Sequence, residues 1–163
     1  MQWSKLRSHL HEFVAPSVLK RIDFHLIRYR KLGDATNEFI VTIDGAKVFS
    51  ASYSRHIIAT YVKERTTRLV SHGDGPEPNE FEKSLMRREI HAPRDITSSI
   101  RTYFDLDPRI ALSSSDPILK AFAMIDKRIG KRTLKAIKLA DDEHSLVKTL
   151  YTLRMECLDE PSE

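Results

Sequence analysis

The chain has 163 residues, of which 40% are hydrophobic and 31% charged, and this composition excludes a wholly disordered polymer. Lys and Arg total 27 and Asp and Glu total 23, but four of the acidic residues follow Arg154, so residues 1–155 carry a net charge of +8, which favours acidic partners. The single cysteine excludes an internal disulfide, and no apolar run approaches the roughly 18 residues of a membrane span, so we expect a cytoplasmic protein that makes no membrane contact.

The N-terminal part begins with a predicted helix and a predicted strand. Ser4 is placed to cap the helix, and Pro16 ends it. The apolar residues of this helix, which recur at helical spacing, are Leu6, Leu10 and Phe13. From residue 21 to residue 29 apolar and polar residues alternate, which is typical of a half-buried strand. Its core face is expected to carry Ile22, Phe24 and Leu26, and its opposite face Asp23, His25, Ile27 and Tyr29.

An Asp44-Gly45 pair between two β-rich runs predicts a hairpin. Both residue types tolerate the positive φ that a type I′ turn requires. Closing the hairpin there assigns Phe39, Val41, Ile43, Ala46 and Val48 to the core face, and Ile40, Thr42, Lys47 and Phe49 to the other. Three antiparallel strands are the simplest result. Residues 54–70 are open to two interpretations, a helix or in part a fourth strand.

Two Gly and two Pro among residues 71–79 indicate a loop or linker, and the chain after it reads as a series of helices. Asn79 can cap the first of these helices, which is expected to end at His91. Asp95 or Thr97 can begin the next one. The position of residues 71–79 makes them the favoured boundary in the chain.

Asp116-Pro117 is a strong start signal for a further helix, because a capping carboxylate precedes a proline at the first helical position. Apolar residues at helical spacing continue from there to Gly130, a natural C-terminal glycine. A short helix is expected around Leu134 and Ile137, and a last one over residues 142–158. The apolar stripe of this last helix is expected to contain Leu146, Leu150, Leu153 and Cys157.

These elements predict an α+β fold. A small antiparallel sheet of three or four strands, with an N-terminal helix, is followed by a C-terminal cluster of four or five helices. We expect a single compact unit over residues 1–163. A subdivision of this unit stays open, into a sheet part (1–70), a linker (71–79), a helical part (80–158) and an acidic tail (159–163).

The side of the sheet opposite the core carries the first candidate site, which consists of Arg21, Asp23, His25, Tyr29 and Phe49. Rings and cations on an open sheet suit single-stranded nucleic acid, because rings stack on bases and cations hold phosphates. The same side chains suit a small-molecule cleft in which Asp23 or His25 is an acid or a base. A face that a helix covers, or one that is merely solvated, is the third interpretation.

A run of cations over residues 127–138, which we call the basic segment, is the second candidate site. Its cations are Lys127, Arg128, Lys131, Arg132, Lys135 and Lys138. Three of them, Lys131, Lys135 and Lys138, are expected on one helix face, where their charges add along a line as a phosphate backbone requires. In the alternative interpretation, Lys127 and Arg128 close a helix and interact with its dipole, and the other cations only promote solubility.

No metal site and no cofactor are expected. The sequence has neither Cys-x-x-Cys nor His-Glu-x-x-His, and Gly73-Asp-Gly75 is followed by prolines rather than by a phosphate-binding helix. Cys157 lies on the apolar stripe of the last predicted helix, where a thiol serves packing.

Four stretches of the sequence carry a family resemblance: Trp3-Ser-Lys-Leu6, residues 21–30, Thr42-Ile-Asp-Gly45 and residues 116–132. Together they resemble a family of small uncharacterised bacterial proteins, over almost the whole chain. The resemblance implies a bacterial, cytosolic, single-unit protein, and it implies no activity, cofactor or site residue.

We therefore expect a non-catalytic binding module for nucleic acid or another polyanion. One alternative is a protein–protein interaction module or homodimer. Another is a small-molecule enzyme that uses Asp23, His25 and Tyr29. The sequence also raises the question of whether the acidic tail folds back on the basic residues, as an autoinhibitory contact would.

Overall fold

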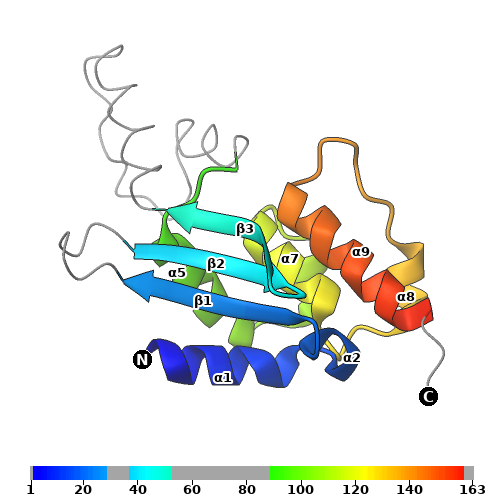
Figure 1. Cartoon of the computed structure of the whole chain (residues 1–163). Coiled ribbons are helices and arrows are strands. Elements are labelled where there is room, and N and C mark those ends of the chain that lie inside the picture. Colours follow the sequence, from blue (N-terminus) through cyan, green and yellow to red (C-terminus); the bar gives the residue numbers. More distant parts are fainter. Residues whose placement is uncertain (1, 29–36, 53–88, 160–163) are drawn as a thin grey trace, which may run out of the picture.

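A computed structural model describes residues 2–28, 37–52 and 89–159 of the chain (Figure 1). In chain order its elements are α1 (Trp3–Phe13), α2 (Pro16–Leu19), β1 (Ile22–Arg28), β2 (Asn37–Ile43), β3 (Ala46–Ser52), α5 (Pro93–Phe104), α6 (Pro108–Leu112), α7 (Pro117–Ile125), α8 (Lys131–Ala136) and α9 (Ser145–Asp159). The predicted α+β order, an N-terminal helix, a small antiparallel sheet and then a helical cluster, is confirmed.

The described part of the chain forms one antiparallel sheet in the order β1-β2-β3. The predicted hairpin at Asp44-Gly45 is present, because φ is 50° at Asp44 and 80° at Gly45. Positive φ at both central residues is the requirement of a type I′ turn. The alternation predicted for the first strand is also confirmed, since Ile22 and Phe24 are buried while Asp23 and His25 lie on the opposite face.

The faces predicted for β3 are wrong from Val48 onward, because the hairpin contains a β-bulge. Val41 pairs with Phe49 and Thr42 pairs with Lys47, which leaves Val48 as an extra residue in β3. The extra residue reverses the faces beyond it. Val48 is therefore 39% exposed, whereas Phe49 is 7% exposed and faces the core beside Val41.

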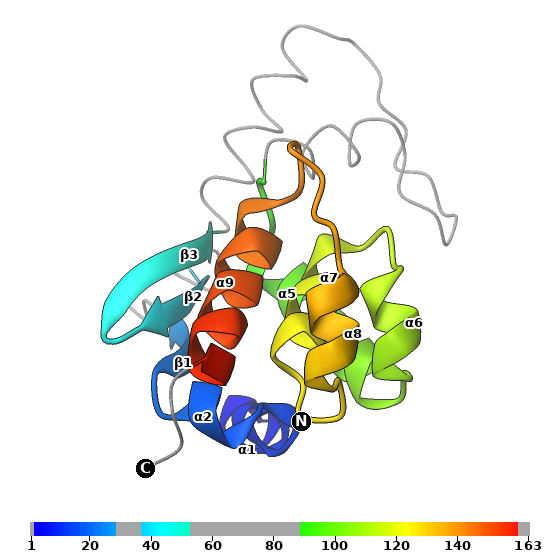
Figure 2. The same ribbon diagram turned by 90° about the vertical axis from the view of Figure 1, so that its right-hand side faces the viewer.

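The helices pack against one face and one end of the sheet. Figures 1 and 2 show α1 running along β1, α5 behind the sheet, and α7 and α9 beside its end. One hydrophobic core joins these layers, and its largest buried rings are Phe24, Phe39, Tyr103 and Phe122. A β-bridge between Val14 and Asp126 ties the chain after α1 to the chain after α7.

Several predicted helix boundaries are wrong. Gln2, not Ser4, occupies the N-cap position of α1, and Pro93 starts α5 before both predicted starts. A short helix, α6, was not expected; it follows Asp107, whose side chain accepts a hydrogen bond from the Arg109 N–H. The last helix begins at Ser145 rather than at residue 142.

The helix that begins at Asp116-Pro117 is shorter than predicted. The Asp116 carboxylate caps α7 as expected, by accepting a hydrogen bond from the Ile118 N–H. The helix ends at Ile125, because Asp126 takes an extended backbone and enters the bridge to Val14. Gly130 is therefore not a C-terminal glycine; it is the N-cap residue of α8.

Some predictions fall outside the described residues. These are Tyr29, the element over residues 54–70, the linker 71–79 and the start of the helix at Asn79. The described end of that helix is wrong, because Glu89 has a φ of 56° and residues 89–92 are not helical. In the three described ranges, no helix has both the length and the apolar character needed to cross a membrane.

Candidate functional site

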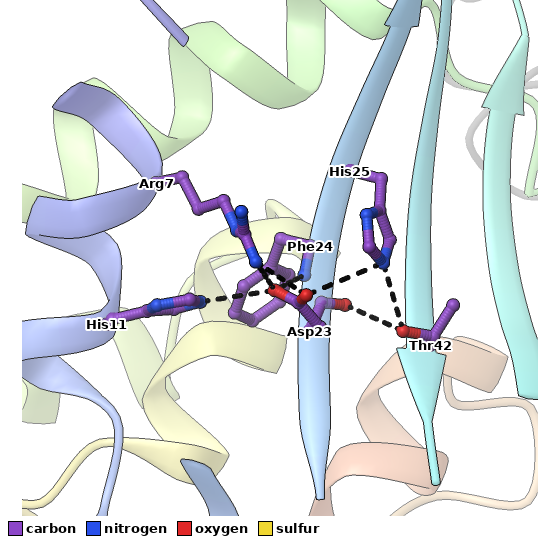
Figure 3. Close-up of polar contacts among 6 residues, drawn as sticks. All are labelled: Arg7, His11, Asp23, Phe24, His25 and Thr42. Atoms are coloured by element: carbon purple, nitrogen blue, oxygen red, sulfur yellow. Dashed lines mark hydrogen bonds and ion pairs between the residues drawn. The ribbon is translucent and has the colours of Figure 1, made fainter. Parts of the chain in front are cut away.

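The outer face of β1 and the facing side of α1 form a polar cluster, which we call the sheet-face cluster (Figure 3). Alternation along β1 directs Asp23 and His25 away from the core. Arg7 and His11 are four residues apart on α1 and therefore reach the strand from the same side of the helix. Thr42 is the neighbour of Asp23 on β2 and completes the cluster.

Asp23 is fully engaged in this cluster. Its Oδ1 accepts hydrogen bonds from Arg7 Nε (3.0 Å), Arg7 Nη2 (2.6 Å) and the Phe24 N–H (2.8 Å), and its Oδ2 accepts one from Arg7 Nη2 (2.5 Å). Partial burial opposes the ionisation of Asp23, but these hydrogen bonds outweigh it and hold the pKa of the carboxyl below its ordinary value. A carboxylate bound by a guanidinium in this way is a weak base.

Two histidines flank the same carboxylate. His11 Nε2 lies 3.5 Å from Asp23 Oδ1, and His25 Nε2 lies 3.7 Å from Asp23 Oδ2 and 3.3 Å from Thr42 Oγ1. Burial and the neighbouring Arg7 charge lower the pKa of His11, against the attraction of Asp23. The cluster thus fastens α1 to the outer face of β1.

Of the sheet-face site residues that lie in the described ranges, which leave out Tyr29, the structure brings only Asp23 and His25 together. Arg21 forms ion pairs elsewhere, with Asp44 (2.7 Å) and Glu156 (3.0 Å). Phe49 is wrong as a site residue because the bulge turns it into the core. The sequence reasoning missed Arg7 and His11, although their spacing of four on a predicted helix was a signal that they share a face.

The basic segment does not form one helix. Lys127 and Arg128 lie in the turn after α7, so they do not close a helix as predicted, and Lys138 follows the end of α8. The predicted common helix face of Lys131, Lys135 and Lys138 is therefore wrong. Within α8, Leu134 is buried and the cations are exposed.

Two of the six cations are held by neighbouring groups. Arg128 donates hydrogen bonds to the buried Asp126 carboxylate, through Nε (3.1 Å) and Nη2 (2.7 Å). Lys131 Nζ donates to the Leu158 carbonyl (3.0 Å) and lies 3.5 Å from Asp159 Oδ1. The C-terminal end of α9, where the predicted acidic tail begins, thus touches the basic segment through Lys131.

The other four cations remain available. They are Lys127, Arg132, Lys135 and Lys138, all of them exposed. Nowhere in residues 2–28, 37–52 and 89–159 does a carboxylate form an ion pair with any of the four. Arg132 and Lys135 are three residues apart on α8 and are neighbours on its surface, and α8 packs against α9 (Figure 2).

Among the described side chains, no group of three or more His, Cys, Asp or Glu is arranged to hold a metal ion. Cys157 is 8% exposed and packs in the core with the apolar residues of α9, as predicted. No curated protein and no solved structure matches the sequence. A family model described as the SF0329 protein family matches residues 2–155, nearly the whole chain. The chain therefore belongs to the SF0329 protein family, a family of uncharacterised proteins.

Proposed function

We propose that this protein is a non-catalytic module that binds a polyanion through the basic segment. The observation that carries the proposal is the set of four exposed cations without an acidic partner among the described residues: Lys127, Arg132, Lys135 and Lys138. An unneutralised cation can exchange its counterion for a phosphate or a sulfate, and the release of small ions favours binding.

Elsewhere on the described surface, exposed cations without an ion pair are scattered over several elements, as at Lys5, Lys20, Arg101 and Arg109, whereas the basic segment brings four of them within twelve residues. Other cations are paired: Arg7 with Asp23, Arg21 with Asp44 and Glu156, Lys47 with Glu38, and Lys120 with Glu143. The net charge of +8 over residues 1–155 attracts a polyanion over a longer range. The single cysteine agrees with a reducing bacterial cytoplasm as the place of action.

Binding and its salt dependence test this proposal. Fluorescence anisotropy would be measured with a labelled single-stranded oligonucleotide and, in competition, with inorganic polyphosphate. Four phosphate contacts on a single strand predict a loss of affinity of about 50-fold between about 50 and 200 mM salt. We expect the triple variant Arg132→Glu, Lys135→Glu, Lys138→Glu to bind at least about tenfold more weakly and with a smaller salt slope.

The matched control is the triple variant Lys5→Glu, Lys20→Glu, Arg94→Glu. It changes the net charge by the same amount at exposed positions outside the basic segment. A clearly smaller effect of the control supports a localised site. Equal losses in both variants, or an absence of binding by the native protein at low salt, would contradict the proposal.

A further inference from the structure

A hollow of about 500 Å³ adjoins the basic segment. It lies between the C-terminal end of α5, the start of α6 and the turn after α7, and it is lined by Phe104, Asp105, Leu106, Asp107, Pro108, Arg109 and Arg128. The volume is in the range that holds a drug-sized or nucleotide-sized ligand. Arg128 belongs both to this hollow and to the basic segment, so the two surfaces are continuous.

Phe104 is the ring that lines the hollow, and two further rings, Phe13 and His9, pack against it. Phe104 is stacked against Phe13, with ring centroids 5.5 Å apart and planes inclined by 14°. The His9 ring packs on Phe104 at 4.3 Å and an angle of 67°, and its side chain is 43% exposed. The Arg128 guanidinium lies 4.5 Å from the centre of the Phe13 ring. Rings and a cation are thus combined here, on the helical side of the molecule.

The polar groups of the hollow are of both signs. Arg109 and Asp105 are exposed, and within the described ranges neither side chain has a hydrogen bond or an ion pair. Arg128 binds Asp126 through Nε and Nη2, and no hydrogen bond of its Nη1 occurs among the described residues. Asp107 is a second carboxylate of the hollow, and its Oδ1 accepts a hydrogen bond from the Arg109 N–H. The hollow therefore offers two guanidinium groups and two carboxylates beside the Phe104 ring, and Asp105 is the carboxylate whose side chain has no hydrogen bond in the described ranges.

These features distinguish one kind of polyanion from others. A plain chain of phosphates or sulfates has no ring to stack and no donor for Asp105, whose charge repels it. A nucleotide has a flat base that stacks on aromatic side chains, amino and hydroxyl donors for a carboxylate, and a phosphate for the arginines. A duplex hides its bases, so only an unpaired strand presents them.

We propose that the hollow seats one nucleotide of a single-stranded nucleic acid, whose neighbouring phosphates follow the basic segment. The base stacks against the Phe104 and His9 rings. Asp105 accepts a hydrogen bond from the base or the ribose, and Arg109 and Arg128 hold the adjacent phosphate. This inference rests on the proposed function and names the ligand class of the same surface.

Asp105→Ala gives the sharpest test, because we expect it to weaken the binding of one ligand and not of the other. Asp105 is exposed and its side chain makes no hydrogen bond in the described structure, so the fold tolerates alanine. We expect the affinity for a single-stranded 12-mer to fall at least threefold, and the affinity for inorganic polyphosphate to stay equal or rise. A fall in both affinities, or a rise in both, overturns the inference.

Phe104→Leu tests the stacking itself. Loss of one stacked base costs about 1–3 kcal/mol, so we expect single-strand affinity to fall roughly 5- to 150-fold, with polyphosphate affinity unchanged within about twofold. Thermal melting checks that the variant is folded. If the melting point drops strongly, Arg109→Ala at an exposed position tests the phosphate contact of the hollow instead, and it should weaken single-strand binding. The control is Arg94→Ala at the other end of α5, which should leave both affinities unchanged.

The outcomes separate this inference from the proposed function. Both the inference and the proposed function are supported if the protein binds a single strand more tightly than a duplex or polyphosphate, and if the variants in the hollow weaken the single-strand binding. In a second outcome, the triple variant of the basic segment weakens the binding of all polyanions, but Asp105→Ala, Phe104→Leu and Arg109→Ala do not. This result overturns the hollow as a nucleotide site and leaves the proposed function standing. Failure of the native protein to bind any polyanion overturns both.

Discussion

At the scale of single residues, the buried Asp126 binds Arg128, which lines the hollow. Its carboxyl is 1% exposed and accepts hydrogen bonds from Tyr103 Oη (2.5 Å), from Arg128 Nε and Nη2, and from the Arg128 N–H (2.7 Å). Burial, and next the bond to Asp126, raise the pKa of Tyr103, so its hydroxyl remains a donor. A buried carboxylate with several donors is compensated, and it fixes the position of Arg128.

Tyr103→Phe removes one of these donors while keeping the ring. Because the bond goes to a charged group in a buried place, we expect the free energy of unfolding to fall by about 1.5–3 kcal/mol. Urea denaturation at neutral pH measures this change. Tyr151→Phe is the control, since its half-buried hydroxyl donates to the neutral Leu134 carbonyl at 3.3 Å and should cost clearly less. Equal costs would show that Asp126 does not depend on Tyr103.

At the scale of elements, the N-terminus of α9 is held by Glu89, which precedes α5, and by His144, which directly precedes α9 itself. Glu89 accepts hydrogen bonds from the Ser145 N–H (2.6 Å) and from Ser145 Oγ (2.5 Å), and His144 Nδ1 accepts the Leu146 N–H (3.1 Å). These bonds satisfy the first free N–H groups of the helix. They explain why α9 begins at Ser145 rather than at residue 142.

A buried histidine pair joins the same two segments. His91 Nε2 and His144 Nε2 are 3.0 Å apart, at exposures of 6% and 8%, and both rings pack near Phe49. Since His144 Nδ1 accepts the Leu146 N–H, the proton of neutral His144 sits on Nε2 and is donated to His91 Nε2. The hydrogen bond that His144 Nδ1 accepts at the start of α9 therefore requires a neutral His144.

Stability should fall in acid because protonation puts a charge on the buried His144 and removes its acceptor for the Leu146 N–H. Burial lowers the pKa of His144, against the attraction of Glu89, Glu143 and Asp116. The unfolded chain takes up the proton first, near its ordinary pKa of about 6.5, so the contribution of His144 is complete above that pH and is lost as the pH falls below it. Urea denaturation at several pH values between 5 and 8 should show this loss, with a slope of at most about 1.4 kcal/mol per pH unit for this group.

His144→Asn separates this titration from the others. Asparagine can still accept the Leu146 N–H at the start of α9, but it has no proton to gain. We expect lower stability at pH 8 and a flatter profile between pH 5 and 7. His11, whose pKa is also lowered, leaves a residual slope of the same sign. A profile as steep as that of the native protein would contradict the role of His144.

At the scale of the whole molecule, the sheet and the C-terminal helices share one described core. Phe24 of β1 packs edge-on against Phe122 of α7 at 5.9 Å, and Trp3 of α1 packs edge-on against Phe39 of β2 at 5.7 Å. Backbone hydrogen bonds connect the same parts, from the Ala15 N–H to the Ile125 carbonyl and from the Lys127 N–H to the Phe13 carbonyl, both 2.8 Å.

The prediction of a single unit over residues 1–163 can be tested by its unfolding. Trp3 is the only tryptophan, so fluorescence reports on the α1 and sheet part, whereas far-ultraviolet circular dichroism reports mainly on the helices. A shared core predicts coincident urea transitions for both signals. Two separate midpoints would favour the subdivision into a sheet part and a helical part.

The parts of the fold that follow from neighbouring residues were predictable. Asp44-Gly45 specified its turn because few residue pairs adopt positive φ twice in succession. Asp116-Pro117 specified the start of α7, because a capping carboxylate and a proline both act within one turn of helix. The apolar stripe of α9 was read from spacing alone, and Leu146, Leu150, Leu153 and Cys157 are buried.

The candidate sites were predictable only in part. Asp23 and His25 share a face because alternation along a strand is a local rule, but their partners on α1 come from packing between elements. The cations of the basic segment were found as a run in the sequence. Which of these cations have partners depends on Asp126, Leu158 and Asp159. Tertiary contacts bring these three residues near Arg128 and Lys131.

The sequence by itself determined the order of the three main parts (first helix, sheet, helical cluster), the turn of the hairpin and the apolar stripe of the last helix, since each depends on backbone preference and side-chain period within a few residues. Only the tertiary structure decided the bulge that buries Phe49, the end of α7 at Asp126 and the ring-lined hollow beside Arg128. Each of these features has a local free-energy cost, such as an unpaired strand residue or an ended helix. Contacts between residues far apart in the chain offset that cost. Such a balance has no signature in any short stretch of sequence.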